Sequence, residues 1–508
     1  MAEKDAHNTT QGSPAHSATK TSQPEITFYG GPQMVLWMVV LFIVLSIVFA
    51  TVFHVYSIEG LTLGAFLCLG VLWIFARDHL QFWNCMVRGL TSFGQAKLLF
   101  VFMVIGIFSK LLMNGKIGEG LVWLSLQWNI QGAAFTAFAF VGTAIVSLGC
   151  GVPFAAIFTG FSIFYAPGVL LGSNPEILAG AIIGGLYFGD TLAPSSQLTF
   201  GALGTQINSL TGKQADLVRT LKQRIPWTIA AAVVTLILIL LIPEKGVAGG
   251  DTTALAALAD PKGLWMLVPI AVVVVVCLKT KEILTGLTFG IITGFGVGMI
   301  AGVFSFDDVI KFQVLEQNKI AGTIMDGMRS MMMMAVMMVF LAGIINLMKV
   351  SGAVDMIMGW LQKVAFFSTP QGAETAIIVL NALMNAFICG AALPGILMMG
   401  ELTNRIGQQA GISPERRTVT ALTSAISLSG VVPFNSIFVL GGISVAGEAM
   451  KQFSGVVLPN AAGVFLNCWF GWLMTAILIL WIITGWGRTW EKDDPDLVAS
   501  AQSSSSAH

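Results

Sequence analysis

Long apolar runs separated by short polar segments fill the chain between residues 34 and 485. The runs Met34–Val55 and Val456–Gly485 are each long enough for a helix to cross the ~30 Å of hydrocarbon in a bilayer. Two runs contain breaks, so we predict an all-α, polytopic membrane fold with about 11 to 13 transmembrane helices. The predicted spans are 34–55, 60–76, 98–114, 133–150, 153–171, 177–190, 227–243, 264–279, 284–303, 331–349, 375–400, 418–447 and 456–485.

Two segments of mixed polarity, 79–93 and 305–329, interrupt this pattern. We expect them to form interfacial helices that lie along the membrane surface. Residues 1–30 and 490–508 are rich in small polar and charged residues, a composition that is typical of disordered tails.

The composition agrees with a membrane protein, because 55% of the residues are hydrophobic and only 10% are charged, against about 25% charged in soluble domains. The net charge is zero, so the expected partner is the lipid bilayer and not nucleic acid. The six cysteines form no Cys-x-x-Cys pair, so the sequence indicates no disulfide framework, no resident metal and no other cofactor. Neither a GxxxxGK(S/T) loop nor a Ser/His/Asp or HExxH pattern occurs, which argues against a primary pump and against an enzyme.

Basic residues set the expected orientation in the membrane. The loop Thr211–Pro226 carries four of them, the last being Arg224, and the turn at Lys279 and Lys281 is also basic. These segments fit the cytoplasm if both termini are cytoplasmic. We therefore expect a multi-pass protein of the cell (inner) membrane, and the sequence leaves a homodimer open.

The two halves of the chain share an ordered series of short matches. They are Gly60-Leu61-Thr62 with Gly286-Leu287-Thr288, Cys150-Gly151 before Pro153 with Cys389-Gly390 before Pro394, and Gly189 and Pro194 with Gly430 and Pro433. By the charge rule the two copies begin on opposite sides of the membrane, because one helix near 227–243 lies between them. This is the inverted-repeat plan of many secondary transporters.

The chain then divides into six parts. These are a cytoplasmic tail (1–30), a first transmembrane repeat (31–212), a basic cytoplasmic loop with a linking helix (213–262), a second, inverted repeat (263–450), a C-terminal transmembrane helix (451–489) and a tail (490–508).

Apolar segments interrupted by Gly or Pro at matching positions of two repeats point to a binding site near the membrane midplane. The segments here are Ser147–Pro153 with Gly189–Thr199, and Asn385–Pro394 with Ser424–Ser436. The residues expected to break them are Gly151, Pro153, Gly189, Pro194, Gly390, Pro394, Gly430 and Pro433.

Asp190 is the strongest candidate for chemistry, because it is the only acidic residue between Glu176 and Asp216. An ionisable group at membrane depth costs roughly 2.5–3.5 kcal/mol on insertion scales and is a functional candidate by default. Loss of water favours the protonated form of a carboxylate, so such a site could exchange a proton for a cation. The alternative is a carboxylate that caps a helix at the interface.

Hydroxyl and amide groups near Asp190 could complete the site. Ser196 and Thr199 are candidate cation ligands, and Ser195 and Gln197 are candidate substrate contacts. In the other half, the candidate substrate contacts are Asn385, Ser429 and Asn435. The alternative for these polar residues is hydrogen bonding between helices, and for Asn381, Ser424 and Ser427 the two interpretations stay equally open.

The segment Gly184–Thr199, which reads Gly-Gly-Leu-Tyr-Phe-Gly-Asp-Thr-Leu-Ala-Pro-Ser-Ser-Gln-Leu-Thr, resembles the signature of the NhaC family of Na⁺/H⁺ antiporters, in the ion-transporter superfamily. The matching positions are Gly189, Asp190, Pro194, Ser196 and Thr199. Thr191 stands where the family has Lys, Ala193 where it has Ser, and Gln197 where it has a second Asp. The resemblance implies an ion-coupled exchanger, and some family members are thought to exchange small organic acids.

The sequence therefore predicts a secondary transporter, first of all a Na⁺/H⁺ antiporter in which Asp190 exchanges the proton and the cation. The alternative within transport is a Na⁺- or H⁺-coupled carrier of an amino acid or organic acid, because an amide at Gln197 suits an organic carboxylate or amino group. An alternative of another class is a non-transporting membrane sensor or assembly factor.

Overall fold

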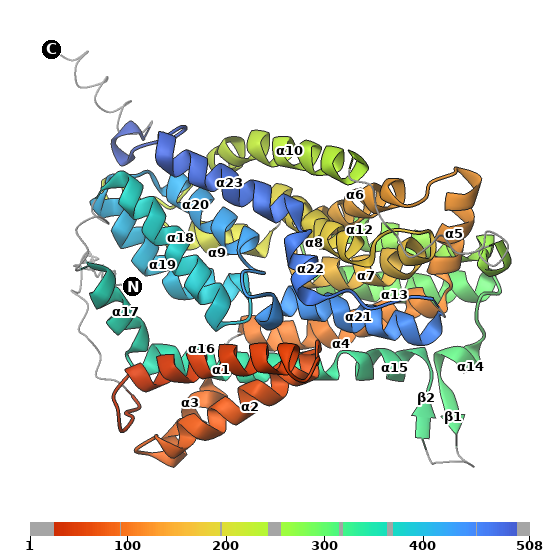
Figure 1. Ribbon diagram of the computed structural model, residues 1–508, viewed down its shortest axis with the longest axis horizontal. Helices are drawn as coiled ribbons and strands as arrows, with labels where there is room; N and C mark the ends of the chain where they lie inside the picture. The colour runs from red at the N-terminus through yellow and green to blue at the C-terminus, as the bar shows by residue number, and fades with distance from the viewer. Residues whose placement is uncertain are drawn as a thin grey trace, which may run out of the picture.

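The computed structural model describes residues 25–91, 93–193, 196–241, 256–313, 319–362, 369–453 and 455–494, and within these ranges the chain is almost entirely helical (Figure 1). The elements of the first half are α1 (Gln33–Thr51), α2 (Ile58–Ile74), α3 (His79–Arg88), α4 (Phe93–Asn114), α5 (Ile117–Gln127), α6 (Ala133–Cys150), α7 (Pro153–Leu170), α8 (Pro175–Leu192), α9 (Gln197–Thr205) and α10 (Leu217–Leu241). Those of the second half are η1 (Pro261–Met266), α12 (Leu267–Thr280), α13 (Ile283–Ile300), α14 (Phe306–Val309), β1 (Lys311–Gln313), β2 (Lys319–Ala321), α15 (Thr323–Ser330), α16 (Met332–Val350), α17 (Ala353–Gln362), α18 (Pro370–Phe387), α19 (Ala392–Gln409), α20 (Pro414–Ser427), η3 (Pro433–Asn435), α21 (Ile437–Gln452), α22 (Ala461–Leu466), α23 (Trp469–Thr484) and η4 (Glu491–Asp493).

Eight of the described helical segments are long and apolar enough to cross a membrane, or nine if the bent pair α8–α9 counts as one span. Two shorter apolar helices, α2 and α23, add to these. The all-α, polytopic membrane class is thus confirmed. The expected spans at 375–400, 418–447 and 456–485 are each cut into shorter helices. Segments that contain Gly or Pro interrupt the first two spans, and Asn467 and Cys468 separate the helices of the third.

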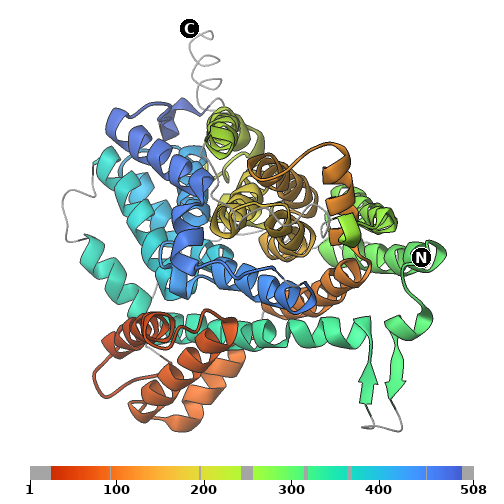
Figure 2. The same cartoon turned by 45° about the vertical axis from the view of Figure 1, so that its right-hand side comes forward.

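Three helices, α6, α7 and α8, pack against one another and are seen nearly end-on at the centre of Figure 2. Every residue of α7 from Pro153 to Val169 is buried, so this helix is surrounded by protein on all sides. Glycines allow α8 to lie directly on the backbone of α6. A Cβ at Gly189 would meet the carbonyl oxygen of Ala144 at 2.3 Å. Gly189 therefore serves close packing inside α8, and the prediction that it breaks the helix is wrong.

Four segments are interrupted at matching positions of the two halves. The breaks lie between α6 and α7, α8 and α9, α18 and α19, and α20 and α21. Pro153 and Pro433 each begin the helix that follows a break, where the missing N–H of proline removes no helical hydrogen bond. Pro394 lies in the first turn of α19, and Gly430 lies between α20 and η3. The opposite orientation of the two halves stays a prediction.

Three segments expected to be disordered or interfacial have a different structure. Within 305–329, a short helix and an antiparallel hairpin of β1 and β2 precede α15, which leads into α16 in place of a separate interfacial helix. Tail residues that we expected to be disordered are partly folded, because Phe28 pairs with Ala76 and Glu491 is buried. Their ion pairs and backbone bridges depend on distant segments, which a local composition cannot indicate.

Candidate functional site

Asp190 lies in the last turn of α8 and is only 2% exposed. Its Oδ2 accepts a hydrogen bond from the hydroxyl of Ser196 at 3.1 Å. Among the residues that the structure describes, Oδ1 has no hydrogen-bond partner. A buried carboxylate oxygen is costly unless something compensates it, so Asp190 has one oxygen available for a ligand.

Ser196 connects Asp190 to the helix beyond the break. Its hydroxyl oxygen accepts from the backbone N–H of Thr199 at 3.3 Å and so caps the N-terminus of α9. The axes of α8 and α9 differ by 51°. The hydroxyl of Thr199 is fully buried and has no hydrogen-bond partner in the described part of the chain. Two other predicted residues of this break, Pro194 and Ser195, lie outside the described residues.

The first two breaks are joined to each other through the backbone. The N–H of Gln197, the first residue of α9, donates to the carbonyl of Gly151 at 3.1 Å. Gly151 has a left-handed backbone, φ +61°, which favours glycine. The carboxylate, its serine and the α6–α7 turn therefore form one connected unit.

The second half repeats this arrangement without a carboxylate. The N–H of Ile437, the first residue of α21, donates to the carbonyl of Cys389 in the α18–α19 break at 2.8 Å. Ser436 caps α21 as Ser196 caps α9, by accepting from the N–H of Val439 at 3.4 Å. Gly390 lies so close to the other break that a Cβ there would meet the Ser429 carbonyl oxygen at 2.1 Å. The matched contacts support an internal repeat.

The asparagines of the second half bind backbone or neighbouring helices. Asn385 donates to the carbonyl of Ala425 at 2.9 Å, and Asn435 donates to the carbonyl of Ala386 at 2.7 Å. The side chain of Asn381 donates to Ser424 at 3.0 Å. These amides hold the two breaks of the second half together, as the alternative interpretation expects. Substrate contact by Asn385 and Asn435 stays a prediction.

Asp190 and Ser429 line the same small cavity of about 10 Å³, which is close to the size of one water molecule. All four broken segments contribute to its wall. The other lining residues are Pro153, Leu186, Tyr187, Leu198, Ala392, Ile426 and Phe438. The carboxylate of the first half thus meets the second half at the point where the helices are interrupted.

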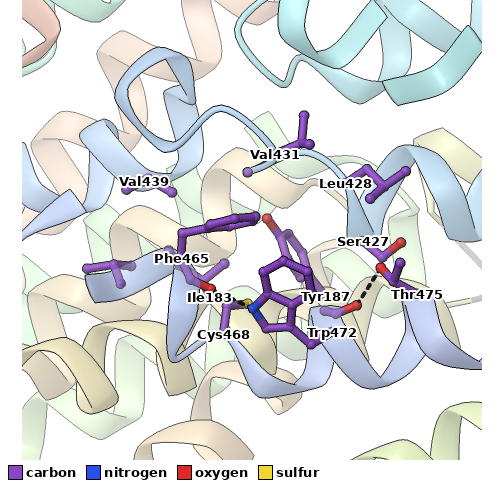
Figure 3. Close-up of a pocket in the computed structure, with 13 residues that line it drawn as sticks. Ile183, Tyr187, Ser427, Leu428, Val431, Val439, Phe465, Cys468, Trp472 and Thr475 are labelled. Atoms are coloured by element: carbon purple, nitrogen blue, oxygen red, sulfur yellow. Dashed lines mark hydrogen bonds between the residues drawn. The ribbon is translucent and has the colours of Figure 1, made fainter. Parts of the chain in front are cut away.

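Tyr187 separates this cavity from a second one of about 50 Å³, shown in Figure 3. The Tyr187 hydroxyl is hydrogen-bonded to the hydroxyl of Ser429, and Phe465 and Trp472, whose ring centroids are 4.8 Å apart, line the second cavity with it (Figure 3). The wall of the second cavity is largely apolar, but it includes Ser427, whose hydroxyl has no hydrogen-bond partner within the described ranges. One hydrogen bond between the two halves thus stands between the two cavities.

A third, larger cavity of about 470 Å³ adjoins the Asp190 cavity on another side, because the two share Pro153, Leu198, Ala392 and Phe438. Gln197, Pro394 and two lysines, Lys97 and Lys281, also line it. Most of its remaining wall is apolar. This cavity is large enough for a small organic molecule, and it places Gln197 next to the carboxylate site.

Sequence reasoning missed Arg224, which we had assigned to a cytoplasmic loop. It lies inside α10, is 1% exposed, and donates through Nη2 to the carbonyl of Thr191, the residue after Asp190. A signal exists in the sequence, since Thr220, Arg224 and Thr228 recur every four residues on the buried side of α10. Tyr187 was also missed, although it lies three residues before Asp190 on the same helix.

A polytopic helical protein with a buried carboxylate where interrupted helices of two halves meet has the design of a secondary transporter. The chain belongs to the Na⁺/H⁺ antiporter family, whose sequence model matches residues 185–486.

Individual relatives agree with this assignment. The chain is 24% identical to the Na⁺/H⁺ antiporter NhaC of Alkalihalophilus pseudofirmus, over 79% of this chain and 86% of that protein. It is 25% identical to the malate-2H⁺/Na⁺-lactate antiporter of Bacillus subtilis over 44% of this chain, and the match spans about half (47%) of that relative's length. It is also 24% identical to an uncharacterized Na⁺/H⁺ antiporter of Haemophilus influenzae, over 66% of this chain and 72% of that one.

Two solved transporter structures align with much of this chain. The YdaH transporter of Alcanivorax borkumensis aligns with 90% of this chain and 98% of its own, with a TM-score of 0.42 and 15% identity. MtrF of Neisseria gonorrhoeae aligns with 80% of this chain and 85% of its own, with a TM-score of 0.43 and 13% identity.

Proposed function

We propose that this protein exchanges Na⁺ for H⁺ across the cytoplasmic membrane, with Asp190 binding the two ions in turn. The observation that carries the proposal is the open Oδ1 of a 2%-exposed carboxylate at the junction of four broken helices. Because one carboxylate cannot hold both ions at full strength, binding of either ion displaces the other. If only loaded forms reorient, that competition becomes exchange.

The ligands for Na⁺ in this proposal are oxygen atoms close to Asp190. The Ser196 hydroxyl already contacts the carboxylate, and the Thr199 hydroxyl is buried one helical turn further on, without a hydrogen-bond partner in the described residues. Unwound backbone at a helix break adds carbonyl oxygens, which coordinate Na⁺ in other transporters with interrupted helices. The motif therefore supplies ligands of the kind that a hard cation prefers.

The two cavities beside the site would serve as its two access routes. The larger one leads past Gln197, and the smaller one begins beyond the Tyr187–Ser429 hydrogen bond. A site reached from one side at a time requires a barrier between the routes, and this hydrogen bond joins residues of the two halves. We place both termini on the cytoplasmic side, because the basic turn at Lys279 and Lys281 then faces the cytoplasm.

Asp190→Asn tests the proposal directly. We expect it to abolish the Na⁺-driven pH change in proteoliposomes, because an amide cannot release a proton or carry the negative charge. Glu401→Gln is the matched control, since the Glu401 side chain is 70% exposed and pairs with Arg405 on the surface. Normal exchange by Asp190→Asn, or equal loss in Glu401→Gln, would contradict the assignment.

A second candidate is coupled transport of a small organic acid, which the 470 Å³ cavity favours. The Gln197 amide and Lys281 give this cavity hydrogen-bond donors and positive charge for a carboxylate, whereas Lys97 is already paired with Glu282 at 2.6 Å. The Bacillus subtilis relative is named as a malate and lactate exchanger. Uptake of labelled malate and lactate into Na⁺-loaded and Na⁺-free proteoliposomes tests it. Na⁺/H⁺ exchange without an added solute, together with no uptake of labelled solute, would reject this second candidate and keep the Na⁺/H⁺ antiporter.

A further inference from the structure

Three arginines, Arg224, Arg416 and Arg417, are buried in the described part of the chain. Arg416 and Arg417 each contact a carboxylate directly, as does Arg488, whose side chain is 8% exposed. Arg416, Arg417 and Arg488 belong to the C-terminal charge cluster, which they form with Glu374 and Glu491. The distances from guanidinium nitrogen to carboxylate oxygen in this cluster are 2.6 to 2.8 Å. Such contacts are what a buried charge needs to be tolerated in a folded protein.

Arg224 is the exception. Its one hydrogen bond goes to the carbonyl of Thr191, and its Nε and Nη1 have no hydrogen-bond partner among the described residues. The carboxylate whose charge acts on it is Asp190, but the two groups are not hydrogen-bonded. Oδ2 of Asp190 is bonded to Ser196, and Oδ1 is open. The structure thus holds two opposite buried charges near each other without closing them into a pair.

This separation has a physical consequence for any ion that binds Asp190. A fixed positive charge nearby repels a bound cation, and the repulsion is strong where little water screens it. An isolated carboxylate in an apolar cavity would hold Na⁺ or H⁺ tightly and release it slowly. A guanidinium that cannot leave, because it is part of α10, weakens the binding of both ions by a fixed amount.

We propose that Arg224 is a positioning residue that tunes ion release, a tethered cation that sets how tightly Asp190 holds Na⁺. The inference rests on the proposed Na⁺/H⁺ exchange. Its hydrogen bond to the Thr191 carbonyl fixes the guanidinium at the C-terminal end of α8, one residue from the ion-binding carboxylate. The alternative is a purely structural role, in which Arg224 only caps the carbonyl end of α8, as basic residues often do.

The test compares Arg224→Met, which removes the charge but keeps much of the length, with Arg224→Lys, which keeps the charge. Na⁺ binding to purified protein and Na⁺-dependent proton release from proteoliposomes are measured at one fixed alkaline pH. We expect Arg224→Met to bind Na⁺ about tenfold more tightly, equivalent to ~1.4 kcal/mol, and to turn over more slowly. Arg224→Lys should stay within about threefold of the unmodified protein in Na⁺ affinity.

Each outcome decides the matter. Unchanged Na⁺ affinity in Arg224→Met, with only a lower unfolding temperature, would reduce Arg224 to a helix cap and overturn the inference. Weaker Na⁺ binding would overturn it as well. If Arg224→Met fails to fold, Arg224→Gln is measured in its place. Asp190→Asn separates the two proposals, because Na⁺ binding that survives this change would refute the exchange site itself.

Discussion

The C-terminal charge cluster and the Asp190 site both bury charges, but they satisfy them differently. In the cluster, Glu374 accepts from Arg416 and from Arg488, and Arg416 also lies 4.8 Å from the ring centroid of Trp481. At the other site, Asp190 keeps one oxygen open. A closed network holds helices together, whereas an open buried charge is available to a ligand. We therefore interpret the cluster as structural and keep Asp190 as the candidate for ion binding.

The largest effect on stability should follow from opening the closed network. Glu374→Ala would leave Arg416 and Arg488 without their shared carboxylate, and breaking a buried pair in this way costs ~3–5 kcal/mol. Thermal unfolding in detergent measures the loss. Asp190→Asn is the comparison, since it breaks no direct ion pair and should lower the unfolding temperature much less. Equal destabilisation by the two changes would mean that the two sites do not differ in kind.

A smaller effect should distinguish two equivalent helix caps. Ser196→Ala and Ser436→Ala each remove an N-cap, worth about 1 kcal/mol of stability, but only Ser196 contacts a carboxylate. We expect Ser196→Ala to raise the KM for Na⁺ about tenfold (~1.4 kcal/mol), while Ser436→Ala leaves it unchanged. Initial rates of Na⁺-driven proton release measure both. A shared change in KM would show that capping alone supports transport.

The smallest effect should come from the hydrogen bond between the two cavities. Tyr187→Phe removes the bond to Ser429 but keeps the ring, a change worth ~1 kcal/mol. Cys468 lines the cavity of about 50 Å³ beyond Tyr187 and is 6% exposed. Its rate of labelling by a thiol reagent therefore reports access to that cavity. We expect labelling to become about fivefold faster. Unchanged labelling would show that Tyr187 is no barrier.

The sequence predicted local features of the site better than tertiary ones. Asp190, Ser196 and the helix breaks lie within short segments, where one ionisable residue among apolar ones and a few glycines and prolines are direct signals. The Tyr187–Ser429 contact joins residues 242 positions apart, and no local pattern specifies it. Arg224 was misplaced because the count of basic residues predicts on which side of the membrane a segment lies. It does not predict whether a residue faces the buried or the exposed side of a helix.

Hydropathy could not place the interruptions within the predicted spans, for a related reason. Hydropathy adds up along a segment, so α18 and α19 together look like one crossing, although four residues between them do not continue the helix. The predicted roles of the polar residues near these breaks could not be decided from the sequence. Asn381 and Asn385 hydrogen-bond to α20, which a sequence cannot distinguish from a ligand contact because either role requires the same amide.

The ion pair between Arg417 and Glu491 has a consequence for how the protein is made. The two residues are 74 positions apart, and Arg417 is completely buried. During synthesis α20 emerges well before its counter-charge, so we expect α20 to settle into the bundle only after α23 has been inserted. Ser429, directly after α20, would then reach Tyr187 late in assembly. In a nascent chain, Asp190 would then be present before Ser429 closes the other side of its cavity. The proposed route for ions would be completed only in the finished protein.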